Sequence, residues 1–327
     1  MTIEDFRFDD ARMAQALAVV REAMPATPAY AWPLLTERYG ADLWVKHENH
    51  TPVGAFKVRG GLVHAERLRR ERPDIGGIIS ATRGNHGQSL AFAARRYGLA
   101  ATIVVPHGNS AGKNAAMRAL GARLIEHGRD FDEAKAHAAG LAADEGLEFV
   151  PSFHPDLVLG VATYAHEFFG QAPALDTVYC PIGLGSGLCG LILTRDLLGL
   201  KTEIVGVVAE KADAYRRSVE AGRPVPTDSA ATFADGMAVR EPDANAVAIM
   251  RAGVARIVSV SEAEIADAMR AYFECVHAVA EGAGAAALAG FAQERDRLAG
   301  RRIGVVLSGQ NIDRSLYLDI LGGARAA

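Results

Sequence analysis

The sequence predicts an α/β protein whose strands form open, twisted, mainly parallel sheets. Two observations support this fold class. Short apolar runs alternate with amphipathic stretches along the chain, and no internal repeat or low-complexity linker interrupts the alternation. The runs are rich in isoleucine and valine and turn-forming residues follow them, which is typical of buried strands. The predicted strands are Gly77–Ser80, Ala101–Val105, Arg123–Glu126, Val178–Cys180, Glu203–Val208, Arg256–Val260 and Gly304–Leu307.

The segments between these strands carry helical patterns. Ala91, Ala94 and Arg95 recur at helical spacing, and Ser261 with Glu264 forms a capping-box pair that predicts a helix start. The predicted helices are Gly87–Tyr97, Ala111–Leu120, Asp130–Glu145, Gly187–Leu198 and Ser261–Ala278.

Composition excludes several classes of protein. The chain has 327 residues, half of them apolar, and 35 basic against 39 acidic residues give a net charge of −4. No basic excess is present to neutralise nucleic-acid phosphates, so a nucleic-acid partner is not expected. No apolar run approaches the ~20 residues that span a bilayer, and the acidic start MTIEDFRFDD is no secretory signal. Cys180, Cys189 and Cys275 lack CxxC spacing, so a cytoplasmic location without disulfides is the default.

Residues 76–149 contain three strand–helix units that could close on themselves. We therefore expect a small domain, 76–149, inserted into a large domain made of 1–75 and 150–327. Ligands of such sheets bind beyond the carboxyl ends of the strands, so the active site is expected between the two lobes.

Lys57 lies one residue after Phe56, just past a Pro/Gly turn and at the expected start of a helix. Apolar neighbours disfavour the ammonium form, so such a lysine becomes a nucleophile near neutral pH. A Schiff base with an aldehyde cofactor requires this property. Taken alone, such a residue is far more often a surface lysine.

Two further segments end predicted strands and open helices. In Ser80–Gln88, free N–H groups at the helix start suit a carboxylate, and Asn85 can donate to a phenolate-type oxygen. The alternative is an ordinary turn with Asn as a cap. In Pro181–Gly190, glycines let N–H groups converge on an anion. That loop lacks the Lys-Ser/Thr ending of a nucleoside triphosphate loop, although by itself it does not exclude a dinucleotide.

These segments resemble, in chain order, motifs of the fold-type II pyridoxal-phosphate enzymes, specifically the threonine/serine dehydratase (ammonia-lyase) and serine racemase family. The run Glu48 to Gly60 is similar to the family's acidic-Asn and G-S-F-K-x-R-G motif, with Ala55 in place of the serine. The resemblance implies a tryptophan synthase β-like fold, pyridoxal phosphate bound to Lys57, and Phe56 packed against its ring. It stops near Gly323, so the regulatory domain of biosynthetic threonine dehydratases is not expected.

The resemblance also implies a substrate site in the asparagine loop. The family's S-S-G-N-H motif binds the substrate carboxylate, and its Asn contacts the cofactor 3′-oxygen; we carry these roles onto Thr82, Gly84, Asn85 and His86. Arg83 replaces a serine that acts as acid and base in the racemases. Because arginine stays protonated, racemisation is disfavoured. Arg83 is expected either to bind a carboxylate or aromatic ring of the substrate side chain or to lie solvated at the cleft lip.

The remaining cofactor contacts are implied in the same way. The glycine loop resembles the family's phosphate loop, although two of its glycines are replaced. The residues carried over there are Gly183, Leu184, Gly185, Ser186, Gly187 and Leu188. Ser308, after the run Val305–Leu307, corresponds to a serine that hydrogen-bonds the pyridine nitrogen, which suits β-elimination better than transamination. Gly236 lies in a segment similar to the family's A-D-G-x-A-V, and Glu281 begins one similar to its E-x-x-G-A-A.

Two further expectations concern a metal site and the oligomeric state. Some relatives bind Mg²⁺ or Ca²⁺ through carboxylates and a carbonyl in the region that Glu210 opens. Arg216 stands where a relative has an acidic ligand, so the sequence favours a site without a metal and keeps Glu210 as the candidate ligand. A homodimer is expected from the resemblance alone.

The expected function is therefore a pyridoxal-phosphate-dependent dehydratase of a small 3-hydroxy amino acid, threonine or serine by default, that yields a 2-keto acid and ammonia. Ala55 and Arg83 keep a bulky or acidic substrate open, such as phenylserine or 3-hydroxyaspartate. A β-replacement enzyme and a non-catalytic binder of pyridoxal phosphate are the lower-ranked alternatives.

Overall fold

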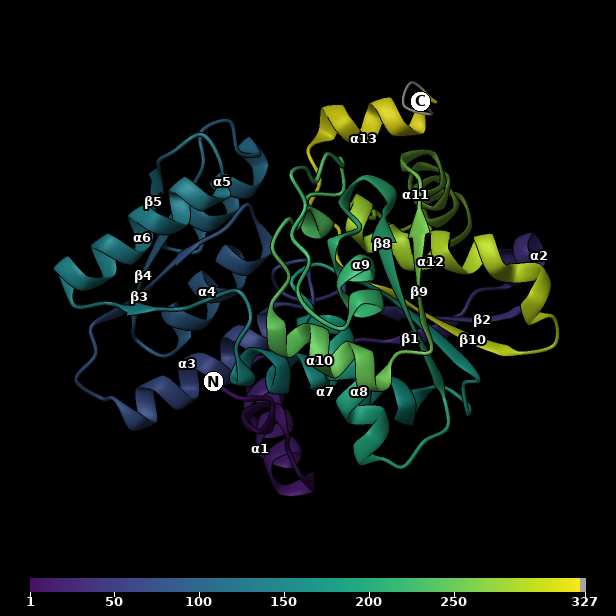
Figure 1. The fold of residues 1–327 in the computed structure, drawn as a ribbon, viewed down its shortest axis with the longest axis horizontal. Coiled ribbons are helices and arrows are strands. Elements are labelled where there is room, and N and C mark those ends of the chain that lie inside the picture. The colour runs from purple at the N-terminus through teal and green to yellow at the C-terminus, as the bar shows by residue number, and fades with distance from the viewer. Residues whose placement is uncertain (324–327) are drawn as a thin grey trace.

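Two sheets organise the computed structural model, which describes residues 1–323 (Figure 1). The larger sheet has six strands in the order β1-β2-β10-β7-β8-β9. All its neighbouring strands run parallel except β1 and β2. These strands are β1 (Ala29–Ala31), β2 (Asp42–His47), β7 (Thr177–Pro181), β8 (Glu203–Ala209), β9 (Arg256–Val260) and β10 (Arg302–Leu307).

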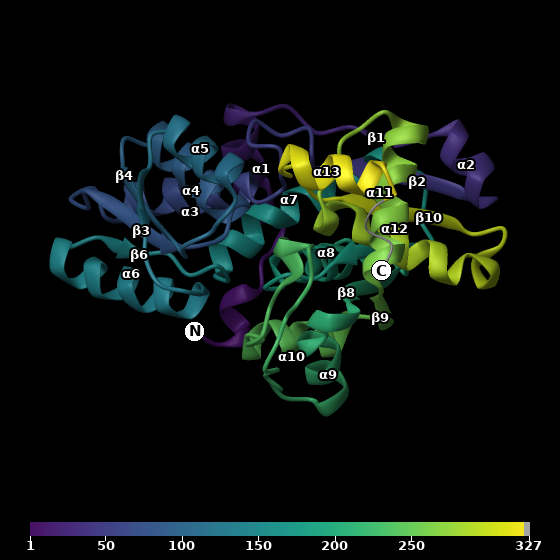
Figure 2. The same ribbon diagram turned by 90° about the horizontal axis from the view of Figure 1, so that it is seen from above.

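The smaller sheet has four parallel strands in the order β5-β4-β3-β6. They are β3 (Gly77–Ala81), β4 (Ala100–Val105), β5 (Arg123–Glu126) and β6 (Glu148–Phe149). This sheet lies in the left-hand lobe of Figures 1 and 2, and the large sheet lies in the right-hand lobe.

Helices cover both sheets. They are α1 (Asp10–Ala23), α2 (Pro33–Tyr39), α3 (Val58–Glu71), α4 (Asn85–Arg96), α5 (Ala111–Ala119), α6 (Phe131–Glu145), α7 (Pro155–Gln171), α8 (Ser186–Leu197), α9 (Ala214–Ala221), α10 (Ala244–Gly253), α11 (Glu262–Val276), α12 (Gly282–Glu294) and α13 (Arg314–Leu321). Short 3-10 turns are η1 (Ile3–Phe6), η2 (Glu210–Ala212), η3 (Asp235–Met237) and η4 (Arg295–Leu298). Within residues 1–323, no helix combines the length and the apolar character needed to cross a membrane.

The predicted α/β class with two mainly parallel sheets is confirmed, and every predicted strand and helix is present. Three strands, β1, β2 and β6, were not predicted. β1 and β6 are too short to show a pattern, and β2 contains Lys46 and His47 at fully buried positions. Charged residues inside a strand hide the apolar run on which the prediction depends.

The core of the small sheet extends beyond the strands that form it. Val58 and Leu62 of α3 and Val20 of α1 share one apolar cluster with Ile78 of β3 and Leu90 of α4. The boundaries 76–149 of the small domain stay a prediction, and this cluster ties that segment to helices that precede it in the chain.

Three of the four motifs follow neighbouring parallel strands. The lysine segment follows β2, Ser308 follows β10, and the glycine loop follows β7, in the sheet order β2-β10-β7. Because parallel strands end at the same edge of a sheet, these segments meet there. The asparagine loop follows β3 of the other sheet.

Candidate active site

Lys57 is the N-cap residue of α3, in agreement with the expected helix start. Ala55 forms an isolated antiparallel bridge with Gly309, and the Phe56 amide donates to the Ser308 carbonyl over 3.1 Å. The loop before α3 is therefore fixed to the end of β10.

The Lys57 amine lies in a setting that favours its neutral form. The side chain is half-buried, and Nζ lies 4.6 Å from the centre of the Phe56 ring. Burial lowers the pKa of Lys57 to about 8, against the opposing effects of Glu281 and Cys180. Among the described residues, no group accepts a hydrogen bond from Nζ. The amine is thus available as a nucleophile near neutral pH.

A buried ion network fixes the start of α3. Arg59 is fully buried; its Nε donates to Glu48 over 2.7 Å, and its Nη1 donates to Glu167 on α7 over 2.8 Å. Lys46 Nζ reaches the same Glu167 over 3.0 Å. Two cations thus face two carboxylates, which places the residue two positions after Lys57 against β2 and α7. Sequence reasoning quoted Arg59 within the motif but assigned it no role.

The glycine loop joins β7 to α8. Gly185 is the N-cap of α8 at φ +105°, a conformation that L side chains rarely adopt, and no side chain of the described residues caps this helix. A Cβ on Gly187 would lie 3.4 Å from the Phe56 ring, so the first turn of α8 lies beside the lysine segment. The open N–H groups there suit an anion such as a phosphate.

The glycine loop is packed so that an anion there would be bound by backbone N–H groups. Leu188 is fully buried in the core, Ser186 is buried, and the Leu184 carbonyl accepts a hydrogen bond from Tyr215 over 2.8 Å. A Cβ on Gly183 would overlap the carbonyl oxygen of Gly236 in η3. The loop and the Gly236 segment therefore pack backbone against backbone.

Asn85 begins α4 and its amide is held at both ends. Its Nδ2 donates to Glu281 Oε1 over 2.5 Å, and its Oδ1 accepts from Asn311 Nδ2 over 2.9 Å. Asn311 also donates to the Val53 carbonyl over 2.7 Å, just before the lysine segment. The sequence places Glu281 near the site, whereas Asn311, three residues after Ser308 in the same segment, was assigned no role.

The rest of the asparagine loop is mostly buried. Thr82 Oγ1 accepts from the Gly84 amide over 3.0 Å. His86 is buried, its Nε2 has no partner among the described residues, and burial lowers its pKa to about 3. Arg83 is exposed and forms no ion pair with a described residue. Like α8, α4 begins without a side-chain cap.

Ser308 ends β10 and is buried. Its Oγ lies 3.3 Å from the carbonyl oxygen of Ala283, to which it donates. The structure thus brings Phe56, Lys57, the glycine loop and Ser308 to one edge of the large sheet, with Asn85 opposite. The roles of the predicted site residues remain predictions.

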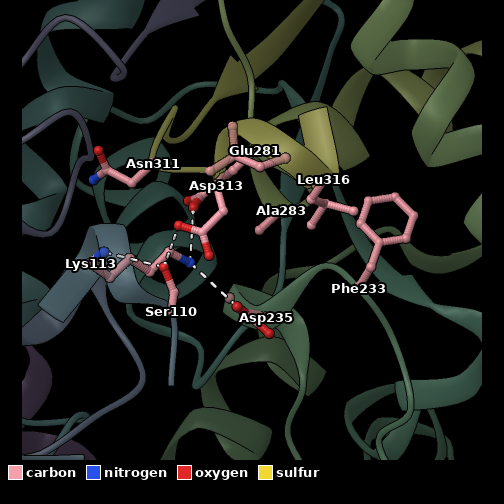
Figure 3. Close-up of a pocket in the computed structure, with 12 residues that line it drawn as sticks. Ser110, Lys113, Phe233, Asp235, Glu281, Ala283, Asn311, Asp313 and Leu316 are labelled. Atoms are coloured by element: carbon pink, nitrogen blue, oxygen red, sulfur yellow. Dashed lines mark hydrogen bonds and ion pairs between the residues drawn. The ribbon is translucent and has the colours of Figure 1, made fainter. Parts of the chain in front are cut away.

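A small, open pocket lies beside this cluster (Figure 3). It lies between the lobes and contains Gly236 and Glu281, but Lys57 does not line it. Its lining residues are Ser110, Lys113, Phe233, Asp235, Gly236, Glu281, Gly282, Ala283, Asn311, Ile312, Asp313 and Leu316.

The predicted metal ligand lies away from the metal-like cluster of the described residues. That cluster is His64, His154 and Asp156, whose ligand atoms lie within 4.8 Å of one another. Arg67 Nε also donates to the shared Asp156 oxygen over 2.7 Å, which disfavours a second cation there. Glu210 in η2 is exposed and stays a candidate ligand only.

Pyridoxal phosphate fits the residues present. Lys57 offers an unpaired amine, the uncapped start of α8 suits the phosphate, and the Phe56 ring lies between them. Ser308 offers a hydroxyl at the same sheet edge, and Asn85 retains one amide hydrogen beyond the bond to Glu281.

Comparisons with known proteins identify the family of the chain. The model of the pyridoxal-phosphate-dependent enzyme family matches residues 20–309. The biosynthetic L-threonine dehydratase of Haemophilus influenzae is 33% identical over 297 residues, which cover 90% of this chain and 58% of that protein. The L-threo-3-hydroxyaspartate ammonia-lyase of Saccharomyces cerevisiae is 32% identical and covers 93% of both chains.

Comparison with solved structures agrees with the sequence comparisons. The processed form of threonine deaminase isoform 2 from Solanum lycopersicum has a TM-score of 0.89 at 29% identity, covering 98% of this chain and 95% of that one. The chain spans a little over half the length of the biosynthetic dehydratases it matches, 58% of the Haemophilus protein. On the family match and these relatives, the chain belongs to the fold-type II pyridoxal-phosphate-dependent enzymes, in the threonine/serine dehydratase and serine racemase family.

Proposed function

We propose that this chain is an ammonia-lyase that dehydrates a 3-hydroxy amino acid to a 2-keto acid and ammonia. One observation carries the proposal: the half-buried Lys57 amine, with its pKa lowered to about 8, lies beside the Phe56 ring and the uncapped start of α8. Relatives named threonine dehydratase and L-threo-3-hydroxyaspartate ammonia-lyase support this reaction class.

The residues of the chain divide the work. The N–H groups at the start of α4 bind the substrate carboxylate, which orients the α-carbon toward Lys57. Lys57 Nζ removes the α-proton, since its lowered pKa increases the fraction of neutral amine near neutral pH. Bound pyridoxal phosphate supplies an electron sink for the negative charge that develops at the α-carbon. The C–O bond at the β-carbon then breaks as the double bond between the α- and β-carbons forms. The hydroxide takes up a proton and leaves as water, which balances the α-proton that Lys57 accepted.

Water completes the reaction. Hydrolysis of the released unsaturated amine gives the 2-keto acid and ammonia. Elimination is favoured over racemisation because Arg83 stays protonated and cannot act as a base on the second face of the substrate.

The proposal is tested with the purified protein and with Lys57→Ala. We expect a visible absorption band from bound pyridoxal phosphate and 2-keto acid release from at least one member of a panel of threonine, serine, 3-hydroxyaspartate and phenylserine. Lys57→Ala should lose both. A variant that keeps the band would show that Lys57 is not the anchor, and a coloured protein inactive on the whole panel would favour the β-replacement alternative.

A second candidate, dehydration of an acidic 3-hydroxy amino acid, is favoured by Arg83. Its guanidinium is exposed next to the start of α4 and pairs with no described carboxylate, so it is free to bind a second carboxylate of the substrate. The yeast L-threo-3-hydroxyaspartate ammonia-lyase also matches over 93% of both chains. Arg83→Ser should lower kcat/KM for 3-hydroxyaspartate at least tenfold relative to threonine. Equal ratios in both proteins would remove this role.

A homodimer and a cytoplasmic location are proposed on the family resemblance and on the cysteine content, respectively. Light scattering of the purified protein tests the first. Activity with and without a chelator tests the Mg²⁺ or Ca²⁺ alternative at Glu210.

A further inference from the structure

Lys113 crosses from the small lobe into the pocket shown in Figure 3. It lies on α5 and is buried, and its Nζ is 3.5 Å from Glu281 Oε2 and 3.5 Å from Asp235 Oδ2. Both carboxylates belong to the large lobe. Gly84 packs against the lysine stem, since a Cβ there would lie 2.6 Å from Lys113 Cδ. The asparagine loop therefore rests on the stem of the residue whose amine bridges the lobes.

Glu281 connects Lys113 to Asn85. One oxygen of this buried carboxylate faces Lys113, and the other accepts from Asn85 Nδ2 over 2.5 Å. The backbone of Gly309 confines the carboxylate from the other side, because a Cβ there would overlap Glu281 Oε1. The Glu281 amide also donates to the Gly309 carbonyl over 3.1 Å.

The orientation of the Asn85 amide depends on the charge of Glu281. An ionised carboxylate only accepts hydrogen bonds, so it holds the NH₂ end of Asn85, while Asn311 holds the carbonyl end. One hydrogen of Asn85 then remains for a cofactor oxygen. A protonated Glu281 would carry a hydrogen-bond donor of its own. The orientation of the Asn85 amide would then no longer be fixed.

We propose that Lys113 is a positioning residue, which keeps Glu281 ionised and thereby fixes the donor hydrogen of Asn85. The proposal rests on the site described under the proposed function, but not on the identity of the substrate. Lys113 touches no reacting atom in this scheme and acts only through Glu281.

The electrostatics support this role. Burial raises the pKa of Glu281, and Lys113 and the Asn85 hydrogen bond oppose that rise. Asp235 of η3 raises it further, Lys57 faces Glu281 from the start of α3, and Asp313 lines the same pocket. Lys113 is therefore the main cation that offsets burial and the Asp235 carboxylate.

An anion subsite at Lys113 is a weaker interpretation of the same pocket. Asp235, Glu281 and Asp313 outnumber the single lysine there. A second carboxylate on a substrate would meet repulsion from all three.

The experiment compares Lys113→Met, Lys113→Arg and a control, Arg118→Met, in the loaded enzyme. Arg118 lies on the same helix but is exposed and pairs with Glu126 over 3.1 Å, away from the pocket. The dissociation constant of pyridoxal phosphate is measured by absorbance after dialysis from pH 6 to pH 8.5. At each pH, the dissociation constant of each Lys113 variant is divided by that of the control. This ratio cancels the pH dependence that belongs to the cofactor itself.

For Lys113→Met, we expect a ratio of at least about three at pH 6 that falls toward one at pH 8.5, because without the Lys113 charge burial raises the pKa of Glu281 further and the carboxyl is protonated first at the lower pH. Lys113→Arg should stay within about twofold of the control, since its charge is kept. In a Glu281→Gln background, Lys113→Met should add less than about twofold, because residues that act as one unit are not additive.

Two results would overturn the proposal. A ratio that is the same at every pH would indicate loss of packing rather than of charge. A full effect of Lys113→Met in the Glu281→Gln background would show that Lys113 does not act through Glu281. Failure of the proposed function appears separately, as a wild-type protein that is coloured but releases no keto acid.

Discussion

Arg59 is expected to be the most costly side chain to remove around the lysine segment. Its guanidinium is fully buried and donates to Glu48 over 2.7 and 3.0 Å and to Glu167 over 2.8 and 2.8 Å. It also donates to Thr163 over 3.1 Å. Arg59→Met keeps much of the volume but leaves two buried carboxylates facing Lys46 as their only buried cation.

Removing one partner of a buried ion pair costs about 3–5 kcal/mol, because the other charge stays buried without compensation. We expect the upper part of that range, since Arg59 serves two carboxylates, although Arg21 reaches Glu167 over 3.0 Å from a more exposed position. The start of α3 should loosen as well, so the affinity for pyridoxal phosphate should fall with stability.

The assay is urea unfolding of the wild type and of Arg59→Met, followed by far-UV circular dichroism. Arg123→Met is the matched control, because Arg123 donates twice to Glu145, over 2.8 and 3.0 Å, in solvent. That variant should lose little stability. A loss below about 1 kcal/mol for Arg59→Met would refute the reasoning that desolvation dominates this network.

Three further predictions concern protonation and backbone space. Burial lowers the pKa of His86 to about 3 and that of His47 to about 4, so the unfolded chain binds more protons below pH about 6.5 and the free energy of unfolding falls there. Each histidine should cost about 1 kcal/mol between pH 6.5 and 5.5, and parallel stability curves for wild type and His86→Gln would contradict this. Gly183→Ala should weaken pyridoxal phosphate binding at least tenfold in dialysis, because its Cβ overlaps the Gly236 carbonyl; unchanged affinity would show that the loop can move. Gly140→Ala in α6, where a Cβ meets nothing within 4 Å, should instead raise stability by about 0.5–1 kcal/mol in urea unfolding, and any loss would contradict the open space.

Local patterns predicted the elements that bear the site. The glycine loop is one example, because Gly185 at φ +105° and the helix that follows it are properties of a few adjacent residues. The capping box of Ser261 and Glu264 is present as expected. β2 was missed because its buried Lys46 and His47 are stabilised by partners far away in the chain, such as Glu167 and Trp32.

The residues of the candidate site also fall into those that the sequence predicted and those that it did not. Lys57, Asn85 and Ser308 were found because each lies in a recognisable segment at the end of a strand. Lys113 was missed, since nothing in its own segment distinguishes it from an ordinary surface helix, and Asn311, in the Ser308 segment, was assigned no role. Their importance appears only when Glu281 and Asn85 are brought between them.

The sequence by itself determined the fold class and the order of the motifs, because hydrophobic periodicity and turn chemistry act over a few residues. Through the family resemblance it also predicted Lys57 as the cofactor anchor. Only the tertiary structure decided which charges share a buried space. The network around Arg59 and the bridge from Lys113 join residues up to 168 positions apart, the separation of Lys113 and Glu281. Such pairs depend on which strand ends meet and on the low dielectric between the lobes, and no local pattern encodes either.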